Sequence, residues 1–328
     1  MIYMNWYHQN LPRILGALSF LINPYFIWLV LKRSKVQVGN YKYLLVMFSV
    51  FDVFYSISEI LTPLGVQGNS HGFVVFISDG PFFEFPLLGQ HVMSNRCGFI
   101  GLSYALLMIH FGYRFLALFS PYHLSYFFKS IGISIMAALM IFYMSSWTLI
   151  CQNCLAADEK VRGIIAEDFY NDYGVSSEKV PMLAALYWNV ETKIQVKSWL
   201  GIGLLTLFSC FSMSVYLVLG YKITMKIRFI KANSALSPSS LKLQRQLFKT
   251  LIVQTCIPIF ASFLPTVISW YAPIFGINIG WWNTNVATVA LAAFPFVDPL
   301  AVILLFPSFR RAVFRKPGAT VDVAMTSL

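Results

Sequence analysis

Long apolar stretches recur along the chain, separated by shorter polar segments. Seven of them approach the ~20 consecutive residues that an α-helix needs to cross the hydrocarbon core of a bilayer. They lie at residues 12–31, 43–64, 91–119, 131–150, 198–220, 248–271 and 283–306. The pattern predicts an all-α membrane protein that is built as a seven-transmembrane helix bundle.

The third stretch carries polar side chains on one side. Arg96 and Arg114 are ~18 residues apart, which is about five helical turns, so both project from the same side of the helix about 27 Å apart. Ser103 and His110 lie close to the same line, whereas apolar side chains fill much of the remaining surface. A helix of this kind faces the interior of a bundle. We therefore expect the other helices to pack around it.

The composition excludes a soluble globular protein. Only 11% of the 328 residues are charged, compared with about 25% in soluble domains, and 58% are hydrophobic. One soluble core cannot bury this much apolar surface, so lipid must form part of the solvent. The net charge of +11 does not indicate nucleic acid, because the basic residues fall in the segments between the apolar stretches. We expect membrane lipid as a partner and no nucleic acid.

The basic residues also predict the orientation in the membrane. Lysine and arginine follow the first, fifth and seventh stretches, whereas segments 65–90 and 273–282 contain neither. Segment 151–197 contains bases but more acids. The positive-inside rule therefore places the N-terminus outside, the C-terminus in the cytoplasm and segment 151–197 in an extracellular loop. Within the segment after the second span, residues 72–86 either lie at the outer membrane interface or fold over the bundle as an apolar loop.

The fifth and sixth spans are predicted to continue as helices into the cytoplasm. Ile223 and Ile227 form one apolar stripe there, with lysines between them. A basic cleft between the two extensions would accept an apolar helix from a cytoplasmic partner, or the lysines and arginines simply tether the helix ends to lipid. Pro258 and Pro265 predict a kink and a hinge in the sixth span.

Two further features indicate contact with lipid headgroups. The tail, 307–328, begins with a short pattern in which Phe309 and Val313 alternate with basic residues. This pattern favours an amphipathic helix on the inner leaflet, and the alternative is a plain stop-transfer cluster of charges. Tryptophans near predicted span ends, such as Trp147 and Trp270, are typical of a belt at the membrane interface.

Ionisable and polar residues lie inside several spans, where they are costly. Asp52 lies midway along the second span, Asn23 precedes a proline in the first, and Asp298 precedes Pro299 in the seventh. These side chains form either a switch that changes state in one hydrated cluster or a static hydrogen-bonded link between helices. Arg114, at the inner end of its span, either belongs to such a switch or extends to the headgroups.

The outer half of the bundle contains the candidate ligand contacts. Arg96 either lines an outward-facing pocket or lies at the interface, and Glu59 has the same two interpretations. Ile100 and Ser103 lie further along the same helix and are candidate ligand contacts. If Arg96 lines the pocket, an organic acid or a carbonyl-rich compound is the favoured ligand.

The cysteines allow a disulfide but do not identify it. Cys151 and Cys154 lie where the fourth span emerges into an oxidising compartment, and Cys97 lies near the outer end of the third span. Any pair of the three is a candidate. The spacing does not suggest a metal site, and we expect neither a metal nor a cofactor.

Several segments, taken in order, resemble one family of receptors. They are MNWYHQNLPRILGALSFLINP, VGNYKYLLVMFSVFDVFYS, GYRFLALFSP and DPLAVILLFPSFRRAVF. Together they resemble the nematode serpentine chemoreceptors of the Str superfamily, class J, which are G-protein-coupled receptors of rhodopsin-like architecture. The resemblance implies a small odorant or water-soluble chemical as ligand, bound in the outer helical half. It also implies coupling of a cytoplasmic cleft to a heterotrimeric G protein, and a plasma-membrane location in the cilia of sensory neurons.

The resemblance also implies roles for individual residues. Arg114 corresponds to the inner-end arginine of rhodopsin-like receptors, and Pro121 to a proline of their second cytoplasmic loop. Asp52 resembles their second-span aspartate and Asn23 their first-span asparagine. The pair Asp298–Pro299 resembles the start of their seventh-span motif.

The chain also departs from that pattern. Gly112 and Tyr113 precede Arg114, so the acidic residue that usually pairs with such an arginine is absent. Val302 occupies the place of the tyrosine that closes the seventh-span motif, and Cys97 lies deeper than the usual cysteine of the third span. These differences affect the expected activation details but not the expected architecture.

The main alternative function is a transporter or ion channel, in which Asp52, Asp298 and Arg114 would line a proton or ion path. The odd number of spans and the lack of visible internal repeats weigh against it. A membrane enzyme is not expected, because the spans contain no HExxH, no GxSxG and no paired His/Asp motif.

Overall fold

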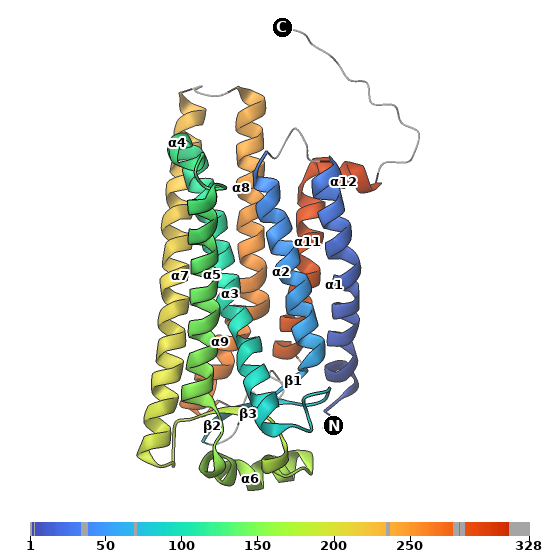
Figure 1. Ribbon diagram of the computed structural model, residues 1–328, viewed down its shortest axis with the longest axis vertical. Coiled ribbons are helices and arrows are strands. Elements are labelled where there is room, and N and C mark those ends of the chain that lie inside the picture. Colours follow the sequence, from blue (N-terminus) through green and yellow to red (C-terminus); the bar gives the residue numbers. More distant parts are fainter. Residues whose placement is uncertain are drawn as a thin grey trace.

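The computed structural model describes residues 2, 4–33, 39–68, 71–233, 237–277, 282 and 286–314. Within these residues, seven helical segments are long and apolar enough to cross a membrane, as the apolar pattern predicts (Figure 1). They are α1 (Trp6–Arg33), α2 (Tyr41–Leu61), α3 (Pro86–Phe119), α5 (Ser130–Ile150), α7 (Thr192–Ala232), α8 (Pro238–Pro258) with α9 (Leu264–Tyr271), and α11 (Thr288–Leu305).

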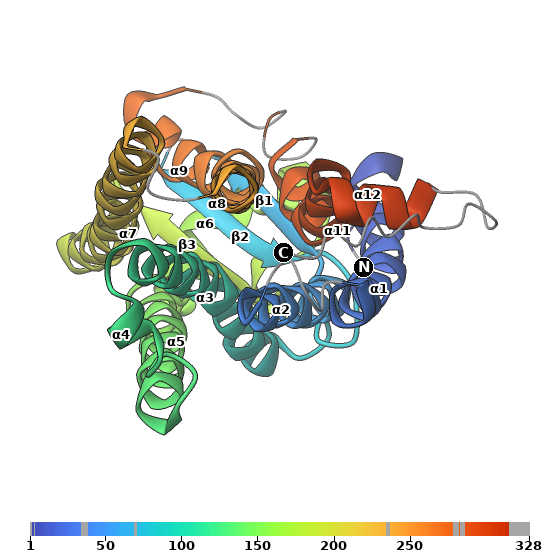
Figure 2. The same cartoon turned by 90° about the horizontal axis from the view of Figure 1, so that it is seen from above.

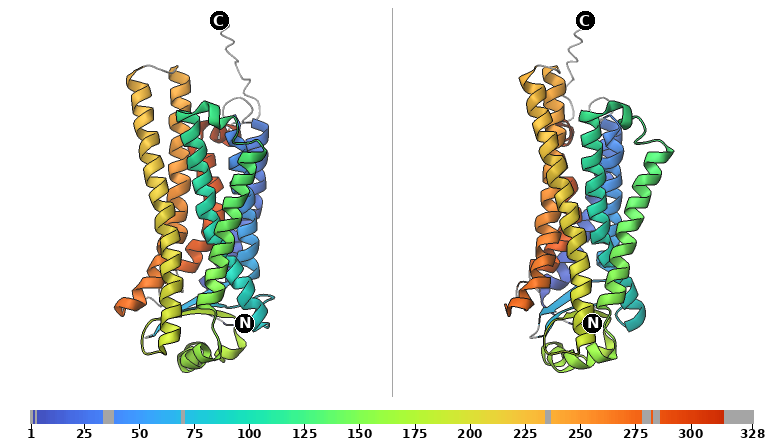
Figure 3. Two further views of the ribbon diagram at one scale, coloured as in Figure 1. Left: turned by 60° about the vertical axis from the view of Figure 1, so that its left-hand side comes forward. Right: turned by 90° about the vertical axis from the view of Figure 1, so that its left-hand side faces the viewer.

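The helices run side by side along the long axis, and the two ends of the bundle differ. The N-terminus lies at one end, which we call the outer end (Figure 1). The opposite, cytoplasmic end carries the short helix α12 (Pro307–Phe314). There α7 continues to Ala232 and α8 begins at Pro238, and both project beyond the other helices (Figure 3). The end that carries these extensions is thus the end where most of the basic residues lie.

The sixth span changes its helical geometry where its prolines lie. Helix α8 ends at Pro258, a π-helical turn, η3 (Ile259–Phe263), follows, and α9 carries Pro265 in its first turn. Proline has no N–H to donate to the preceding turn, so the regular α-helical hydrogen bonding is interrupted here. The span bends in this region (Figure 3), where the sequence predicts a kink.

A small antiparallel sheet closes the outer end, and the sequence analysis did not predict it. Its strands, in the order β1-β2-β3, are β1 (Leu64–Gly68), β2 (Gly72–Ile77) and β3 (Met182–Leu186). Of the two interpretations of residues 72–86, folding over the bundle is the one observed, with its first part forming a strand. Gly72 is required where β2 meets β3, because a Cβ there would lie 1.9 Å from the carbonyl oxygen of Ala185.

Both faces of this sheet are covered. Phe73 packs in the main core of the bundle, whereas Val74 and Phe76 pack in a second core with Phe169 of α6 (Glu159–Tyr173). Figure 2 shows the sheet lying across the middle of the bundle when the molecule is viewed along the helices. We refer to the sheet and α6 together as the outer cap. The segment 151–197, expected as a loop, therefore provides both a helix and a strand of the cap.

The outer cap is held to α3 by a buried arginine. The Arg162 guanidinium donates to the carbonyl oxygens of Ser177 (2.6 Å), Val180 (2.7 Å) and Ala157 (3.2 Å), and to Oε1 of Gln90 in α3 (3.1 Å). Burial lowers the pKa of Arg162, because it disfavours the charged guanidinium, and the charge of Glu178 partly opposes this effect. Four backbone and side-chain acceptors therefore take the place of a counter-ion.

The predicted amphipathic helix of the tail is present as α12. Its Phe309 is fully buried and packs on Phe26 of α1, with ring centroids 5.8 Å apart. Arg310 and Arg311 are exposed. The helix lies across the bundle axis (Figure 2), which is the orientation that contact with the inner leaflet requires. The remaining bases of the predicted pattern, Arg315 and Lys316, lie outside the described residues, and contact with the leaflet stays a prediction.

Candidate functional site

An apolar cavity of about 80 Å³ lies in the outer part of the bundle, on the side of the cap that faces the helices. Helices from both sides of the bundle and all three strands contribute to its wall. The lining residues include Val66, Phe73, Leu183, Ile100, Trp147, Leu205, Trp270 and Leu291. Two of the hydroxyl groups at the wall already donate within their own helix, Thr266 to the Ser262 carbonyl (2.7 Å) and Ser269 to the Pro265 carbonyl (3.0 Å). The cavity therefore favours a small, neutral and largely apolar molecule.

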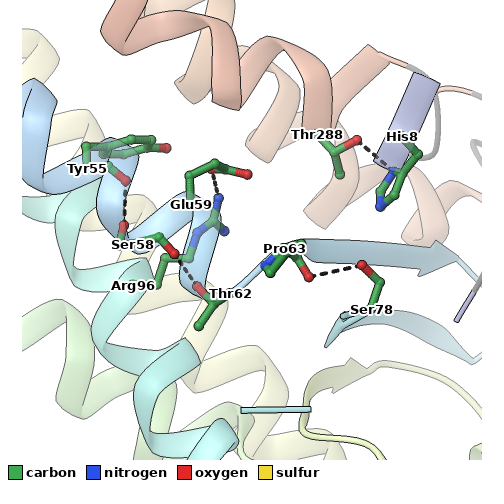
Figure 4. A network of polar contacts seen from close by, with 9 residues as sticks. All are labelled: His8, Tyr55, Ser58, Glu59, Thr62, Pro63, Ser78, Arg96 and Thr288. Atoms are coloured by element: carbon green, nitrogen blue, oxygen red, sulfur yellow. Dashed lines mark hydrogen bonds and ion pairs between the residues drawn. The ribbon is translucent and has the colours of Figure 1, made fainter. Parts of the chain in front are cut away.

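Of the four residues predicted to contact the ligand, only Ile100 lines this cavity. Arg96 instead forms an ion pair with Glu59 of α2, and each side chain is 5% exposed (Figure 4). Ser103 donates to the carbonyl oxygen of Ile100 (2.7 Å). Because Arg96 does not line the cavity, the condition for favouring an organic acid as ligand is not met. A ligand role for Arg96, Glu59 and Ser103 stays a prediction.

Two tryptophans of the cavity wall were expected at the membrane interface. Trp147 is 1% exposed and Trp270 is 7% exposed, so neither forms part of a lipid-facing belt. Tyr104 of α3 stacks on Trp147 (centroids 5.6 Å apart) and on Phe263 of the π-helical turn (4.0 Å). The cavity wall is thus connected by ring contacts to the bend in the sixth span. Trp199, at 39% exposed, is consistent with the interface belt.

Two of the three candidate cysteines meet at the cavity. Cys97 and Cys151 both line it. Cys154 lies to one side, against Gly201 of α7. All five cysteines of the chain are free in the structure. The disulfide stays a prediction, and Cys97–Cys151 is the pair that the packing brings together.

None of the hydrogen bonds among the described residues joins Asn23, Asp52 and Asp298 to one another. Asn23 donates to the carbonyl oxygen of Pro295 (2.9 Å) and to Ser19, linking α1 to α11. Asp298, which precedes Pro299 in α11, accepts from Gln254 of α8 (3.1 Å).

Asp52 is completely buried, and neither of its carboxylate oxygens has a hydrogen-bond partner among the described residues. It interacts electrostatically with Asp298, so the two acids are neighbours. A buried carboxylate without donors is costly. Asp52 is therefore the least satisfied polar group of this region.

Arg114 connects α3 to α8 near the cytoplasmic end. Its side chain is buried, 2% exposed, and does not extend to the headgroups. It donates to Oε1 (2.8 Å) and to the carbonyl oxygen (3.1 Å) of Gln244, and lies over the ring of Tyr41 at 5.8 Å. We call the two hydrogen bonds to Gln244 the Arg114–Gln244 bridge. Arg114 is thus hydrogen-bonded to a neutral amide of another helix and not to an acid.

The cytoplasmic end also carries a basic cleft, of about 600 Å³, next to the bridge. It lies between the start of α8 and the end of α11, and its lining combines apolar and basic side chains: Pro238, Leu241, Lys242, Arg245, Gln246, Lys249 and Leu305. Pro121, the other residue predicted on this side, begins the short helix α4 (Pro121–Leu124) directly after α3.

Comparisons with known proteins agree with this architecture. The family model described as "Serpentine type 7TM GPCR chemoreceptor Srj" matches residues 2–313. Over 311 residues the chain is 33% identical to serpentine receptor class J-38 of Caenorhabditis elegans, covering 94% of this chain and 93% of that protein. It is 29% identical over 309 residues to serpentine receptor class r-10 of the same nematode, covering 91% and 87%. It is 25% identical over 315 residues to the nematode's G-protein coupled receptor str-217, covering 94% and 89%.

These matches extend over almost the whole bundle and not over an isolated segment. They support a multi-pass chemosensory receptor and do not favour a transporter or channel. The chain therefore belongs to the Srj family of serpentine chemoreceptors, which are seven-transmembrane G-protein-coupled receptors.

Proposed function

We propose that the outer cavity is the ligand site, and that its ligand is a small, neutral, largely apolar external chemical. The observation that carries the proposal is the lining of the cavity, which joins the strands of the cap to α3, α9 and α11. A ligand in the cavity would contact the cap, the third span and the sixth and seventh spans at once. The ion pair of Arg96 with Glu59 supports a neutral ligand, because the arginine already has its counter-ion.

The sixth span is the proposed route to the cytoplasmic end. Trp270 of α9 lines the cavity, and the stack of Tyr104 on Phe263 connects α3 to the π-helical turn that precedes α9. A ligand that favours one position of α9 would bias the position of α8, since the two belong to one span. A turn with irregular hydrogen bonding is a natural place for such a change.

At the cytoplasmic end, the Arg114–Gln244 bridge would hold the receptor in its resting state. Breaking the bridge would let α8 move away from α3 and open a site for the α-subunit of a G protein beside the basic cleft. Pro121, Asn23, Asp52, Asp298 and Pro299 are proposed to belong to the same switch, as the resemblance to rhodopsin-like receptors implies. The resemblance also supports a location in the cilia of sensory neurons.

The test is expression in heterologous cells with a G-protein activation readout across volatile and water-soluble compounds. Replacing Ile100 with Trp would fill the cavity, so the response to an active compound should be lost while basal activation is retained. Ile133→Trp is the matched control, because Ile133 is 52% exposed on the lipid-facing surface of α5. An Ile100→Trp receptor that responds as the parent does would exclude this cavity as the site.

A further inference from the structure

A second apolar groove, distinct from the ligand cavity and the basic cleft, lies between α7 and α8 in the cytoplasmic half. Its volume is about 240 Å³. Gly220 of α7 and Phe248 of α8 form part of its walls, and Phe111 of α3, which is 4% exposed, also lines it. A Cβ on Gly220 would lie 3.5 Å from the Phe111 ring, so the glycine leaves room without being sterically required.

The groove opens toward lipid. Leu217, Tyr221 and Ile252 lie along it and are 71%, 67% and 42% exposed, on helices that cross the membrane. Figure 3 shows α7 and α8 side by side over this length. The groove therefore faces acyl chains and not water.

Three of the polar side chains that line the groove are already hydrogen-bonded within the protein. Thr224 donates to the Gly220 carbonyl (2.8 Å), Thr255 donates to the Leu251 carbonyl (2.8 Å), and Tyr216 donates to a carbonyl of α3 (2.7 Å). The surface offered to an occupant is consequently apolar, which suits a hydrocarbon chain.

A positive charge lies at the cytoplasmic end of the groove. Arg228 follows Thr224 by one helical turn and Tyr221 by about two, so all three share one face of α7. Arg228 is exposed and belongs to no ion pair among the described residues. This end faces the inner leaflet, whose anionic lipids attract basic residues.

We propose that this groove binds one anionic phospholipid of the inner leaflet, with an acyl chain against Phe111 and Phe248 and the headgroup at Arg228. The apolar lining selects a chain, and the charge selects an anionic headgroup. Because the groove is formed by α7 and α8 together, the bound lipid would join the two helices that extend into the cytoplasm.

The test uses the full-length receptor in nanodiscs with equal amounts of phosphatidylserine and phosphatidylcholine, and native mass spectrometry of the lipids that stay bound on release. The parent receptor should retain phosphatidylserine over phosphatidylcholine by about fivefold, the preference expected from one basic residue near the surface. Arg228→Ala should remove this preference. Lys226→Ala is the matched control, because Lys226 lies over the Phe119 ring on the opposite side of α7.

A second pair of variants tests the groove itself. Gly220→Leu should fill it and abolish lipid retention, whereas Gly203→Leu should not, because Gly203 lies in the same helix with no atom within 4 Å of its Cβ position. Equal retention of the two lipids by the parent receptor would overturn the proposal. So would unchanged retention in Gly220→Leu, or a loss in Lys226→Ala as large as that in Arg228→Ala.

Discussion

The outer and cytoplasmic halves of the bundle satisfy their buried polar groups in different ways. In the outer half, Arg96 is paired with Glu59, and Arg162 has four hydrogen-bond acceptors. In the cytoplasmic half, Arg114 has only the neutral Gln244 as a hydrogen-bond partner among the described residues, and in the middle of the bundle Asp52 has none. The outer half is therefore built to keep one arrangement.

The cytoplasmic half, by contrast, has little free energy holding its polar groups in place. A bridge to an amide is weaker than a buried ion pair, and an unpaired acid is destabilising in any closed state. A receptor needs this difference between its two halves, because its ligand supplies only a few kcal/mol to change the state of the cytoplasmic end. Four substitutions test the comparison, from the largest expected effect to the smallest.

The largest effect is expected for Arg96→Ala. The change leaves Glu59 buried without its partner and should destabilise the protein by about 3–5 kcal/mol, measured as thermal stability in detergent. The double variant Arg96→Met, Glu59→Leu should recover most of this loss, because no unpaired charge remains. If Arg96→Ala kept the parent's stability but lost its ligand response, Arg96 would act on the ligand and not on the fold.

Removing the side chain of Arg162 should cost about 2–3 kcal/mol, because several buried carbonyl groups lose their donor. The loss should be local to the cap and appear as faster hydrogen exchange in β3 and α6. Arg162→Lys keeps the charge but supplies fewer donors in a different geometry. Its stability should therefore lie between that of the parent and that of the variant without the side chain. Uniform exchange across all seven spans would show that the cap is not a separate unit.

A smaller effect is expected for Gln244→Ala, and it is a gain of basal G-protein activation and not a loss of stability. Losing the Arg114–Gln244 bridge should favour the open state by about 1.5 kcal/mol, which is about a tenfold rise in basal G-protein activation. Met225→Ala is the control, since Met225 is 46% exposed on α7, does not line the basic cleft and is not a partner of Arg114. Basal activation that stays at the parent level in Gln244→Ala would contradict the role of the bridge.

The smallest effect is expected at the surface of the cap, where Lys160 lies 2.8 Å from Glu191. The hydrogen bond and charge of Lys160 lower the pKa of the Glu191 carboxyl. Any stability from this pair is present at neutral pH and lost as pH falls through the lowered pKa. Because both side chains are exposed, Lys160→Ala should leave thermal stability unchanged at pH 7. A measurable loss would mean that the cap depends on its surface charges.

The spans could be predicted from the sequence because lipid imposes a simple requirement. A helix must satisfy all of its backbone groups internally, so each span needs a long apolar run, and those runs are visible without any knowledge of packing. The amphipathic helix α12 was predicted for a similar reason, since Phe309 and its basic neighbours are local in sequence. The bend in the sixth span follows from Pro258 and Pro265 in the same way.

The sheet of the cap was missed because its strands do not alternate. Both faces are buried, so β2 reads as the continuous run GFVVFI, which also suits a membrane-interface segment. The pairing of β2 with β3 joins residues more than a hundred positions apart. No local pattern contains that information.

The partners of the predicted site residues could not be predicted from the sequence, for the same reason of distance. The ion pair of Arg96 with Glu59 depends on how α2 and α3 pack, which residue types alone do not determine. Trp147 and Trp270 lie near span ends, where tryptophan usually faces the interface, and only the packed bundle shows that they line the cavity. Ile100, one helical turn after Arg96, is the one predicted contact that lines the cavity.

The strands above the cavity are held to each other through backbone hydrogen bonds, which do not depend on side-chain identity. Side chains such as Phe73 and Leu183, which line the cavity, can therefore be exchanged while the strands stay paired. Under the proposed function, chemical selectivity would thus depend on side chains that the strand pairing does not require. Such a division would let duplicated copies of one receptor diversify toward new compounds by changing only a few positions.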